Sequence, residues 1–157
     1  MSFAFRTVPS LICQLGAASS KTKCMLGNIF KTELNCSSIL LVTDEHINKI
    51  GLLEHAIENI QDAGINVKVF DKVTGDPPES IVIEALKQAE GIDGVLGFGG
   101  GSSLDVSKVV AFLEGDSSQE LNDIYGVENC VGKRLPLVLV PTTAGTGSEF
   151  DLVEQLV

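Results

Sequence analysis

Short apolar runs alternate with stretches of helical periodicity along this chain, and this alternation constrains its fold more than any other feature. Each run has four or five residues, the length and character of a strand buried on both faces of a sheet. The predicted strands are residues 39–42, 67–70, 94–98 and 137–140. Because helix-like segments separate them, we predict βαβ units, and hence an α/β fold with a mostly parallel sheet and helices on both faces.

Three helices are predicted between these strands. Apolar residues at positions 47, 50, 53, 57 and 60 recur at steps of three or four, which indicates a single helix face that Gly64 terminates. A second helix is expected from Pro78 to residue 89, because proline fits the first helical turn. A third is expected from near Ser103 to residue 113.

The remaining segments carry weaker signals. Residues 3–15 alternate in polarity and predict a short two-stranded ribbon. A short helix is expected within residues 16–36, and residues 114–134 are polar and irregular.

Composition limits the classes of protein that the chain can represent. Its 157 residues, 44% hydrophobic and 20% charged, predict one folded domain. A net charge of −10 disfavours nucleic acid and anionic membranes as partners. The N-terminus lacks the pattern of a signal peptide and no apolar run is long enough to span a bilayer, so we expect a cytoplasmic protein. The sequence is compatible with a monomer or with a homo-oligomer.

The cysteines and histidines do not have the spacing of a metal site or of a reactive thiol pair. The four cysteines form no C-x-x-C pair, so ordinary reduced thiols are expected. The two histidines, His46 and His55, are nine positions apart and would lie on opposite sides of one helix. We interpret both as surface or packing residues.

The run Gly99-Gly100-Gly101-Ser102, called the glycine loop below, joins the third strand to the third helix. Glycines let the backbone approach a ligand closely, and the first N–H groups of a helix lack internal partners, so such a loop can bind a pyrophosphate. The alternative is a tight turn in which Ser102 and Asp105 form a capping box. That alternative leaves three consecutive glycines unexplained. The spacing is neither the fingerprint G-x-G-x-x-G nor a P-loop.

Asp44 directly follows the first strand. A carboxylate there can accept hydrogen bonds from the ribose hydroxyls of NAD and would repel the 2′-phosphate of NADP. It can equally serve as the N-cap of the next helix, and the sequence leaves both roles open.

The segment 142–148, called the threonine loop below, follows the fourth strand with three threonines, one serine and two glycines. It can hydrogen-bond to phosphate or to a nicotinamide carboxamide, or it can be a polar surface loop. Asp44, Asp76, the glycine loop and the threonine loop all follow predicted strands. We therefore expect them to gather at the crevice outside the carboxyl ends of the sheet.

Two of these motifs resemble the iron-dependent (group III) alcohol dehydrogenase family. The family pattern G-G-G-S-x-x-D-x-[AS]-K is matched by residues 99–108, and P-T-T-A-G-T-G-S-E by residues 141–149. Val42-Thr43-Asp44 matches the family's strand end, whereas Asp76-Pro77 departs from the usual Asn-Pro. The resemblance implies a Rossmann-like domain, similar to the N-terminal domain of dehydroquinate synthase, spanning residues 1–157 and incomplete at its C-terminal end.

The resemblance also implies roles for particular residues. Asp44 would hold the adenosine ribose, with Asp76 nearby, and Asp105 would lie toward the nicotinamide. The pyrophosphate would lie on Gly100, Gly101 and Ser102. The threonine loop would line the cofactor through Thr142, Thr143 and Thr146.

Full-length members of the family transfer a hydride between an alcohol or aldehyde and NAD(P), with Fe²⁺ or Zn²⁺ polarising the substrate oxygen. Their metal ligands lie in a helical C-terminal domain that this sequence does not include, so no metal is expected to bind to this chain. The resemblance implies the cofactor-binding part of such an oxidoreductase. The alternative is a non-catalytic nucleotide-binding module or a truncated product without the metal site.

Overall fold

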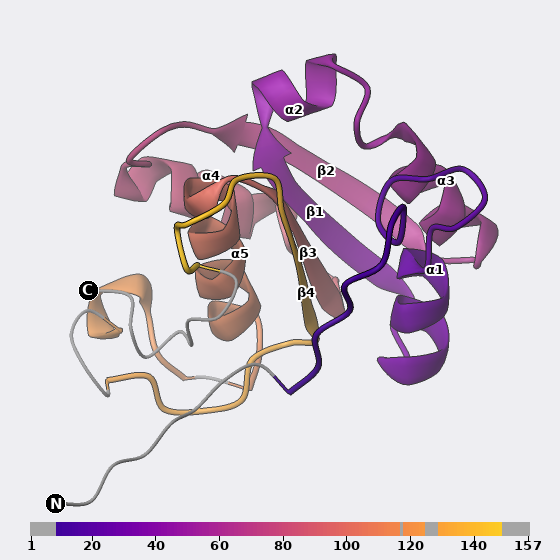
Figure 1. The fold of residues 1–157 in the computed structure, drawn as a ribbon. Helices are drawn as coiled ribbons and strands as arrows, with labels where there is room; N and C mark the ends of the chain where they lie inside the picture. Colours follow the sequence, from indigo (N-terminus) through magenta and orange to yellow (C-terminus); the bar gives the residue numbers. More distant parts are fainter. Residues whose placement is uncertain (1–8, 117, 125–128, 149–157) are drawn as a thin grey trace, which may run out of the picture.

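In the computed structural model, which describes residues 9–116, 118–124 and 129–148, four parallel strands form one sheet. The sheet has the order β2-β1-β3-β4, and all three neighbouring pairs are parallel (Figure 1). Its strands are β1 (Ser38–Asp44), β2 (Asn66–Val73), β3 (Gly94–Gly99) and β4 (Leu137–Pro141). The predicted parallel α/β sheet is confirmed.

Helices cover both faces of the sheet, as predicted (Figure 1). They are α1 (Leu26–Asn28) with the π-helical turn η1 (Ile29–Glu33), α2 (Glu45–Lys49), α3 (Glu54–Asp62), α4 (Glu79–Gln88), α5 (Gly101–Leu113) and the 3₁₀ turn η2 (Leu121–Asp123). Side chains alternate along β1, so Leu40 packs with α4 and α5 whereas Leu41 packs with α1 and α3. Two apolar clusters therefore enclose the sheet.

The single helix predicted over positions 47–60 is wrong. The chain turns at residues 50–53, between α2 and α3. Gly51 has a φ of +74°, which an α-helix cannot contain, and Ile50 is 56% exposed. The apolar spacing continues across the turn because Leu53 and Ile60 both pack into the apolar cluster that α1 and α3 form on one face of the sheet. Gly64, with a φ of +77°, ends α3 as predicted.

The start of α5 also differs from the prediction. The helix begins at Gly101 with Gly100 as its N-cap, two residues before the expected start. Ser102 and Asp105 therefore lie inside the helix, and the capping-box alternative is wrong. Residues 9–15 contain no strand, and residues 3–8 of the predicted ribbon lie outside the described residues. The short helix expected within 16–36 corresponds to α1 and η1.

Small residues let α5 approach β3 closely. A Cβ atom built on Gly97 would lie 2.5 Å from Ser107 Oγ, and one built on Gly99 would lie 2.8 Å from Ser103 Oγ. Ser103 and Ser107 are both buried, one turn apart on the helix. Glycine facing serine thus places α5 directly on the sheet and its N-terminus at the carboxyl edge.

At the opposite edge, Asp93 joins the beginnings of β1 and β3. Its carboxylate accepts hydrogen bonds from the Ser37 and Ser38 amides at 2.8–2.9 Å and from Ser37 Oγ at 2.6 Å. Partial burial by itself raises the pKa of Asp93, but these hydrogen bonds outweigh it and hold the pKa below the ordinary value. The ionised form therefore stabilises this edge of the sheet.

The lowered pKa predicts how stability changes with pH. The contribution of Asp93 is present above its unfolded-state pKa of about 3.9 and is lost as the pH falls through its lower folded-state pKa. We expect Asp93→Asn to reduce the free energy of unfolding by about 1 kcal/mol at neutral pH, since one charged acceptor is lost at a partly solvated site. Urea unfolding from pH 7 to pH 3 should show the deficit shrinking below about pH 4. The exposed Glu33→Gln is the control, and a deficit independent of pH contradicts the assignment.

Candidate nucleotide-binding site

An open pocket of about 450 Å³ lies at the carboxyl edge of the sheet. Its walls come from the ends of β1 and β2 and from the first turn of α5. The lining residues are Asp44, Glu45, His46, Val73, Thr74, Gly75, Gly100, Gly101, Ser102 and Ser103. Of the nine residues predicted for the site, the pocket thus gathers four, namely Asp44, Gly100, Gly101 and Ser102.

The glycine loop forms the end of the pocket that faces α5. Gly99 has a φ of +154° and passes close to Ser103, so both its conformation and its surroundings favour glycine. Gly100 is extended, and its carbonyl accepts the first helical bond from the Leu104 amide at 3.1 Å. The amides before Leu104 belong to the first turn, which lacks internal partners in any helix. An anion in the pocket would meet these donors and the positive end of the helix dipole.

Asp44 serves as the N-cap of α2. Its Oδ1 accepts a hydrogen bond from the Ile47 amide at 3.0 Å, which confirms the capping alternative. The other oxygen, Oδ2, would lie 3.4 Å from a Cβ atom built on Gly99. The carboxylate therefore stands beside the glycine loop with one oxygen committed to the cap, and capping leaves the second oxygen for a ligand.

The threonine loop packs against the glycine loop and does not line the pocket. The Thr142 amide donates to the Gly99 carbonyl at 2.8 Å. A Cβ atom on Gly100 would lie 3.6 Å from Thr143 Cγ2, and one on Gly101 would lie 3.2 Å from Thr146 Cγ2. Thr142, Thr143 and Thr146 are exposed beside the first turn of α5.

The other two predicted residues also lie outside the pocket wall. Asp76 has a φ of +47° and is exposed, and its neighbours Thr74 and Gly75 line the pocket instead. Asp105 lies one turn into α5, where its carboxylate accepts hydrogen bonds from Lys108 Nζ at 3.0 Å and from Ser148 Oγ at 3.4 Å. Both contacts are within the protein.

Sequence reasoning missed several residues of the site. His46, interpreted as a surface or packing residue, is exposed and also lines the pocket, because it lies in the first turn of α2, two residues after the cap Asp44. Thr74 was missed because β2 continues three residues beyond the predicted strand end. Lys108 is only 1% exposed although it is a lysine, and its place between buried Ser107 and Val109 was the available signal.

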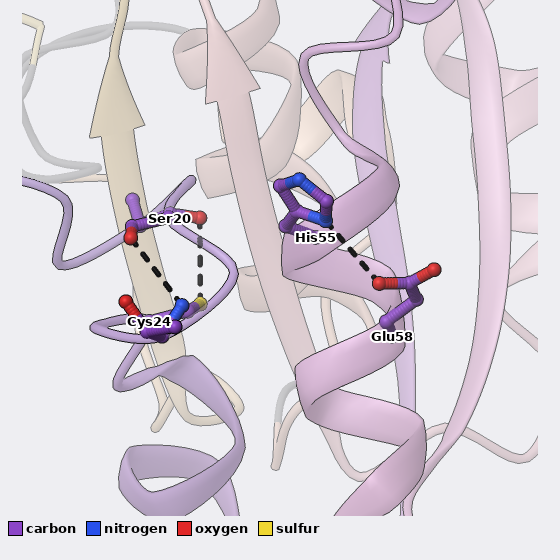
Figure 2. A network of polar contacts seen from close by, with 6 residues as sticks. Ser20, Cys24, His55 and Glu58 are labelled. Atoms are coloured by element: carbon purple, nitrogen blue, oxygen red, sulfur yellow. Dashed lines mark hydrogen bonds and ion pairs between the residues drawn. The ribbon is translucent and has the colours of Figure 1, made fainter.

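The other nucleophilic and metal-binding candidates lie elsewhere. His55 contacts Glu58 on α3 at 3.2 Å, and the Cys24 amide donates to the Ser20 carbonyl at 3.0 Å (Figure 2). Burial raises the pKa of the Cys24 thiol, and burial together with the Asp93 charge raises that of Cys36 to about 11. Both thiols are therefore protonated at neutral pH and are poor nucleophiles.

In residues 9–116, 118–124 and 129–148, no group of three or more His, Cys, Asp or Glu side chains is placed to hold a metal ion. Within the same ranges, no helix combines the length and apolar character that crossing a bilayer requires.

A parallel sheet with a glycine-rich strand-to-helix turn at its carboxyl edge defines the class of doubly wound α/β domains. Within that class, the model of the family "iron-containing alcohol dehydrogenase" matches residues 24–153. The chain belongs to the iron-containing alcohol dehydrogenase family.

Individual relatives agree with this assignment. The chain is 35% identical over 120 residues to the NAD-dependent methanol dehydrogenase of Bacillus methanolicus, a match that covers 74% of this chain and 31% of that protein. It is 40% identical over 115 residues to the 4-hydroxybutyrate dehydrogenase of Cupriavidus necator, with coverages of 70% and 30%. The chain thus spans about a third of the length of these curated relatives.

Solved structures share the fold. A 1,3-propanediol oxidoreductase superposes with a TM-score of 0.85 at 28% identity, covering 96% of this chain and 38% of that one. The NADH-dependent butanol dehydrogenase A of Thermotoga maritima superposes with a TM-score of 0.81 at 25% identity, with coverages of 95% and 36%. The resemblance first seen in two motifs therefore extends over the sheet and its helices.

Proposed function

We propose that this chain is the NAD-binding part of an oxidoreductase that transfers a hydride between a small alcohol or aldehyde and the cofactor. One observation carries the proposal: the first turn of α5, built on Gly100 and Gly101, opens into the same pocket as the Asp44 carboxylate. A pyrophosphate and a ribose need these two features at one place. The relatives are named for methanol, 4-hydroxybutyrate, 1,3-propanediol and butanol, and these names support a small alcohol as the substrate.

The residues present fit a dinucleotide. Gly101 has no Cβ, and one placed there would lie 3.2 Å from both Thr146 Cγ2 and Ser148 Oγ, so the space beside the helix start is already shared with the threonine loop. The helix amides would hold the pyrophosphate locally, against the net charge of −10. Ser102 would add a hydroxyl donor at the same end of the pocket.

The acidic groups at the mouth of the pocket favour NAD over NADP. Asp44 and Glu45 both line it, and a 2′-phosphate placed there would meet two carboxylates. The Oδ2 atom of Asp44 would accept from the ribose hydroxyls while Oδ1 keeps the cap of α2.

The reacting end of the cofactor would lie toward the threonine loop. When bound, the nicotinamide supplies the chemistry by accepting or donating the hydride. Thr142, Thr143 and Thr146 would orient its carboxamide, and Asp105 would support that end through Ser148.

Asp44→Asn tests the proposed ribose contact. Asparagine is an equally good N-cap, so α2 should be preserved while the charge is removed. We expect NAD to bind about fivefold more weakly, since one charged hydrogen bond becomes neutral, and NADP to bind better than it does to the wild type. Isothermal titration calorimetry with NAD, NADP and ADP-ribose measures all three.

Glu58→Gln on α3, away from the pocket, is the matched control and should leave the affinities unchanged. Failure of the folded wild type to bind either NAD or ADP-ribose would overturn the proposal. Binding without turnover of any alcohol by this chain is the expected result if the rest of the active site lies in the part that longer relatives have. A measurable rate would show that these residues suffice.

A further inference from the structure

Lys108 is a buried lysine that cofactor binding, as described above, does not use. Its side chain is 2% exposed, on the α5 face that also carries buried Leu104 and Ala111. An ammonium group in such a place is costly unless it is paired. Its Nζ donates to Asp105 Oδ1 at 3.0 Å, one turn earlier on the same helix. This ion pair therefore fixes where the Asp105 carboxylate can point.

The second oxygen of that carboxylate reaches a different part of the chain. Asp105 Oδ2 accepts a hydrogen bond from Ser148 Oγ at 3.4 Å, across 43 residues of sequence. Ser148 is 6% exposed, and its Oγ would lie 3.2 Å from a Cβ atom on Gly101. The Lys108–Asp105–Ser148 link thus ties the threonine loop to α5 beside the proposed pyrophosphate site.

The hydrogen bond from Ser148 to Asp105 is long, and it therefore depends on the ion pair between Asp105 and Lys108. At 3.4 Å the Ser148 hydrogen bond is longer than the usual 2.7–2.8 Å between a hydroxyl and an oxygen, so a small shift of the carboxylate breaks it. Asp105 is 38% exposed and without its ion pair could swing toward water, whereas the side chain of Lys108 is almost wholly buried. The buried ammonium is therefore the fixed end of the link.

We propose that Lys108 is a positioning residue: by holding Asp105, it keeps Ser148 and the threonine loop docked against the first turn of α5 and so prearranges the site for the cofactor. The docking part needs only the contacts above, while the consequence for the cofactor rests on the proposed function. A preformed loop lowers the ordering cost that a ligand must otherwise meet on binding.

The test is a double-mutant cycle read at the Thr142 amide of the nucleotide-free chain. That amide donates to the Gly99 carbonyl, so its hydrogen exchange reports opening of the loop. We expect Lys108→Met and Ser148→Ala each to speed its exchange about tenfold, and the double variant to exchange no faster than either single one. Lys108 and Ser148 interact only through Asp105 among the described contacts, so additive effects would overturn the proposal.

Two controls separate docking from general stability. The Val95 amide, bonded to the Pro136 carbonyl at the other end of the sheet, should keep its exchange rate in all variants. Lys68→Met removes a lysine that donates to the Gln88 and Glu90 carbonyls, and it should leave Thr142 unaffected. If Thr142 and Val95 accelerate together in Lys108→Met, the lysine acts only on stability and the proposal is wrong.

A second variant covers the case in which Lys108→Met does not fold. Asp105→Ala removes the acceptor of Ser148 together with the carboxylate that pairs with the ammonium. It should speed Thr142 exchange as Ser148→Ala does and be non-additive with it. Calorimetry with NAD then tests the consequence: each variant should bind about tenfold more weakly. Absence of NAD binding by the wild type counts against the proposed function, whereas the exchange cycle still decides the role of Lys108.

Discussion

Gly101→Val should abolish NAD binding while the chain remains folded. A Cβ atom at this position would already lie 3.2 Å from Thr146 Cγ2 and from Ser148 Oγ, and the two further methyl carbons of valine extend beyond it. They must either push the threonine loop away or fill the space in front of the helix amides. We expect affinity to fall at least a hundredfold, about 3 kcal/mol, as measured by calorimetry. Valine has a somewhat higher helix propensity than glycine, so the start of α5 should remain helical in this variant.

Gly75→Ala is the matched control for that experiment. Gly75 also lines the pocket, but a Cβ atom there would meet nothing within 4 Å. NAD affinity should therefore change less than twofold, or about 0.4 kcal/mol. Gly101→Ala should lie between the two, because a single methyl group needs the neighbouring loop to move by only a few tenths of an ångström. Retained affinity in folded Gly101→Val would show that the glycine loop does not hold the pyrophosphate.

Gly97→Ala should have the largest effect on stability. The added Cβ atom would lie 2.5 Å from Ser107 Oγ and 2.8 Å from Leu139 Cδ2, in the interior of the central strand β3. Because α5 rests directly on this strand, the helix has to retreat and the packing on both sides loosens. We expect the free energy of unfolding to fall by about 3 kcal/mol, the upper part of the range for overpacking. Urea denaturation measures this loss.

A compensating substitution tests the cause of that loss. Ser107→Gly removes both atoms of the serine that the new methyl group would strike, so the double variant should recover part of the stability. Recovery stays incomplete because the contact with Leu139 remains and a helical glycine costs about 1 kcal/mol. Gly75→Ala, in open space, should leave stability nearly unchanged. Equal stability of Gly97→Ala and the wild type would show that α5 does not need this close approach.

The strands were predictable because a strand buried on both faces of a sheet appears in the sequence as a short, continuous apolar run. All four apolar runs became strands, with β2 ending three residues later than predicted. The position of the glycine loop between a strand and a helix was equally predictable, whereas its role as a pyrophosphate site stays a prediction. Its family resemblance, carried by residues 99–108 and 141–149, extends to a family match over residues 24–153.

Two of the errors concern places where the backbone turns, which the spacing of residue types along the sequence does not mark. Positions 47–60 keep a helical spacing although Gly51 reverses the chain between α2 and α3. The spacing of Ser102 and Asp105 fits a capping box, yet Gly100 is the cap of α5. Asp44 illustrates the opposite case: both of its roles were foreseen, and the structure confirms the cap and leaves the ribose contact as a proposal.

The sequence by itself determined the four strands of the sheet, the presence of helices between them and the position of the glycine loop. These features follow from short-range sterics and from the alternation of apolar residues. Only the tertiary structure decided the strand order β2-β1-β3-β4, the packing of the threonine loop against the glycine loop outside the pocket, and the burial of Lys108. Those outcomes join residues as far apart as Asp105 and Ser148, and such contacts depend on how the sheet and helices pack together.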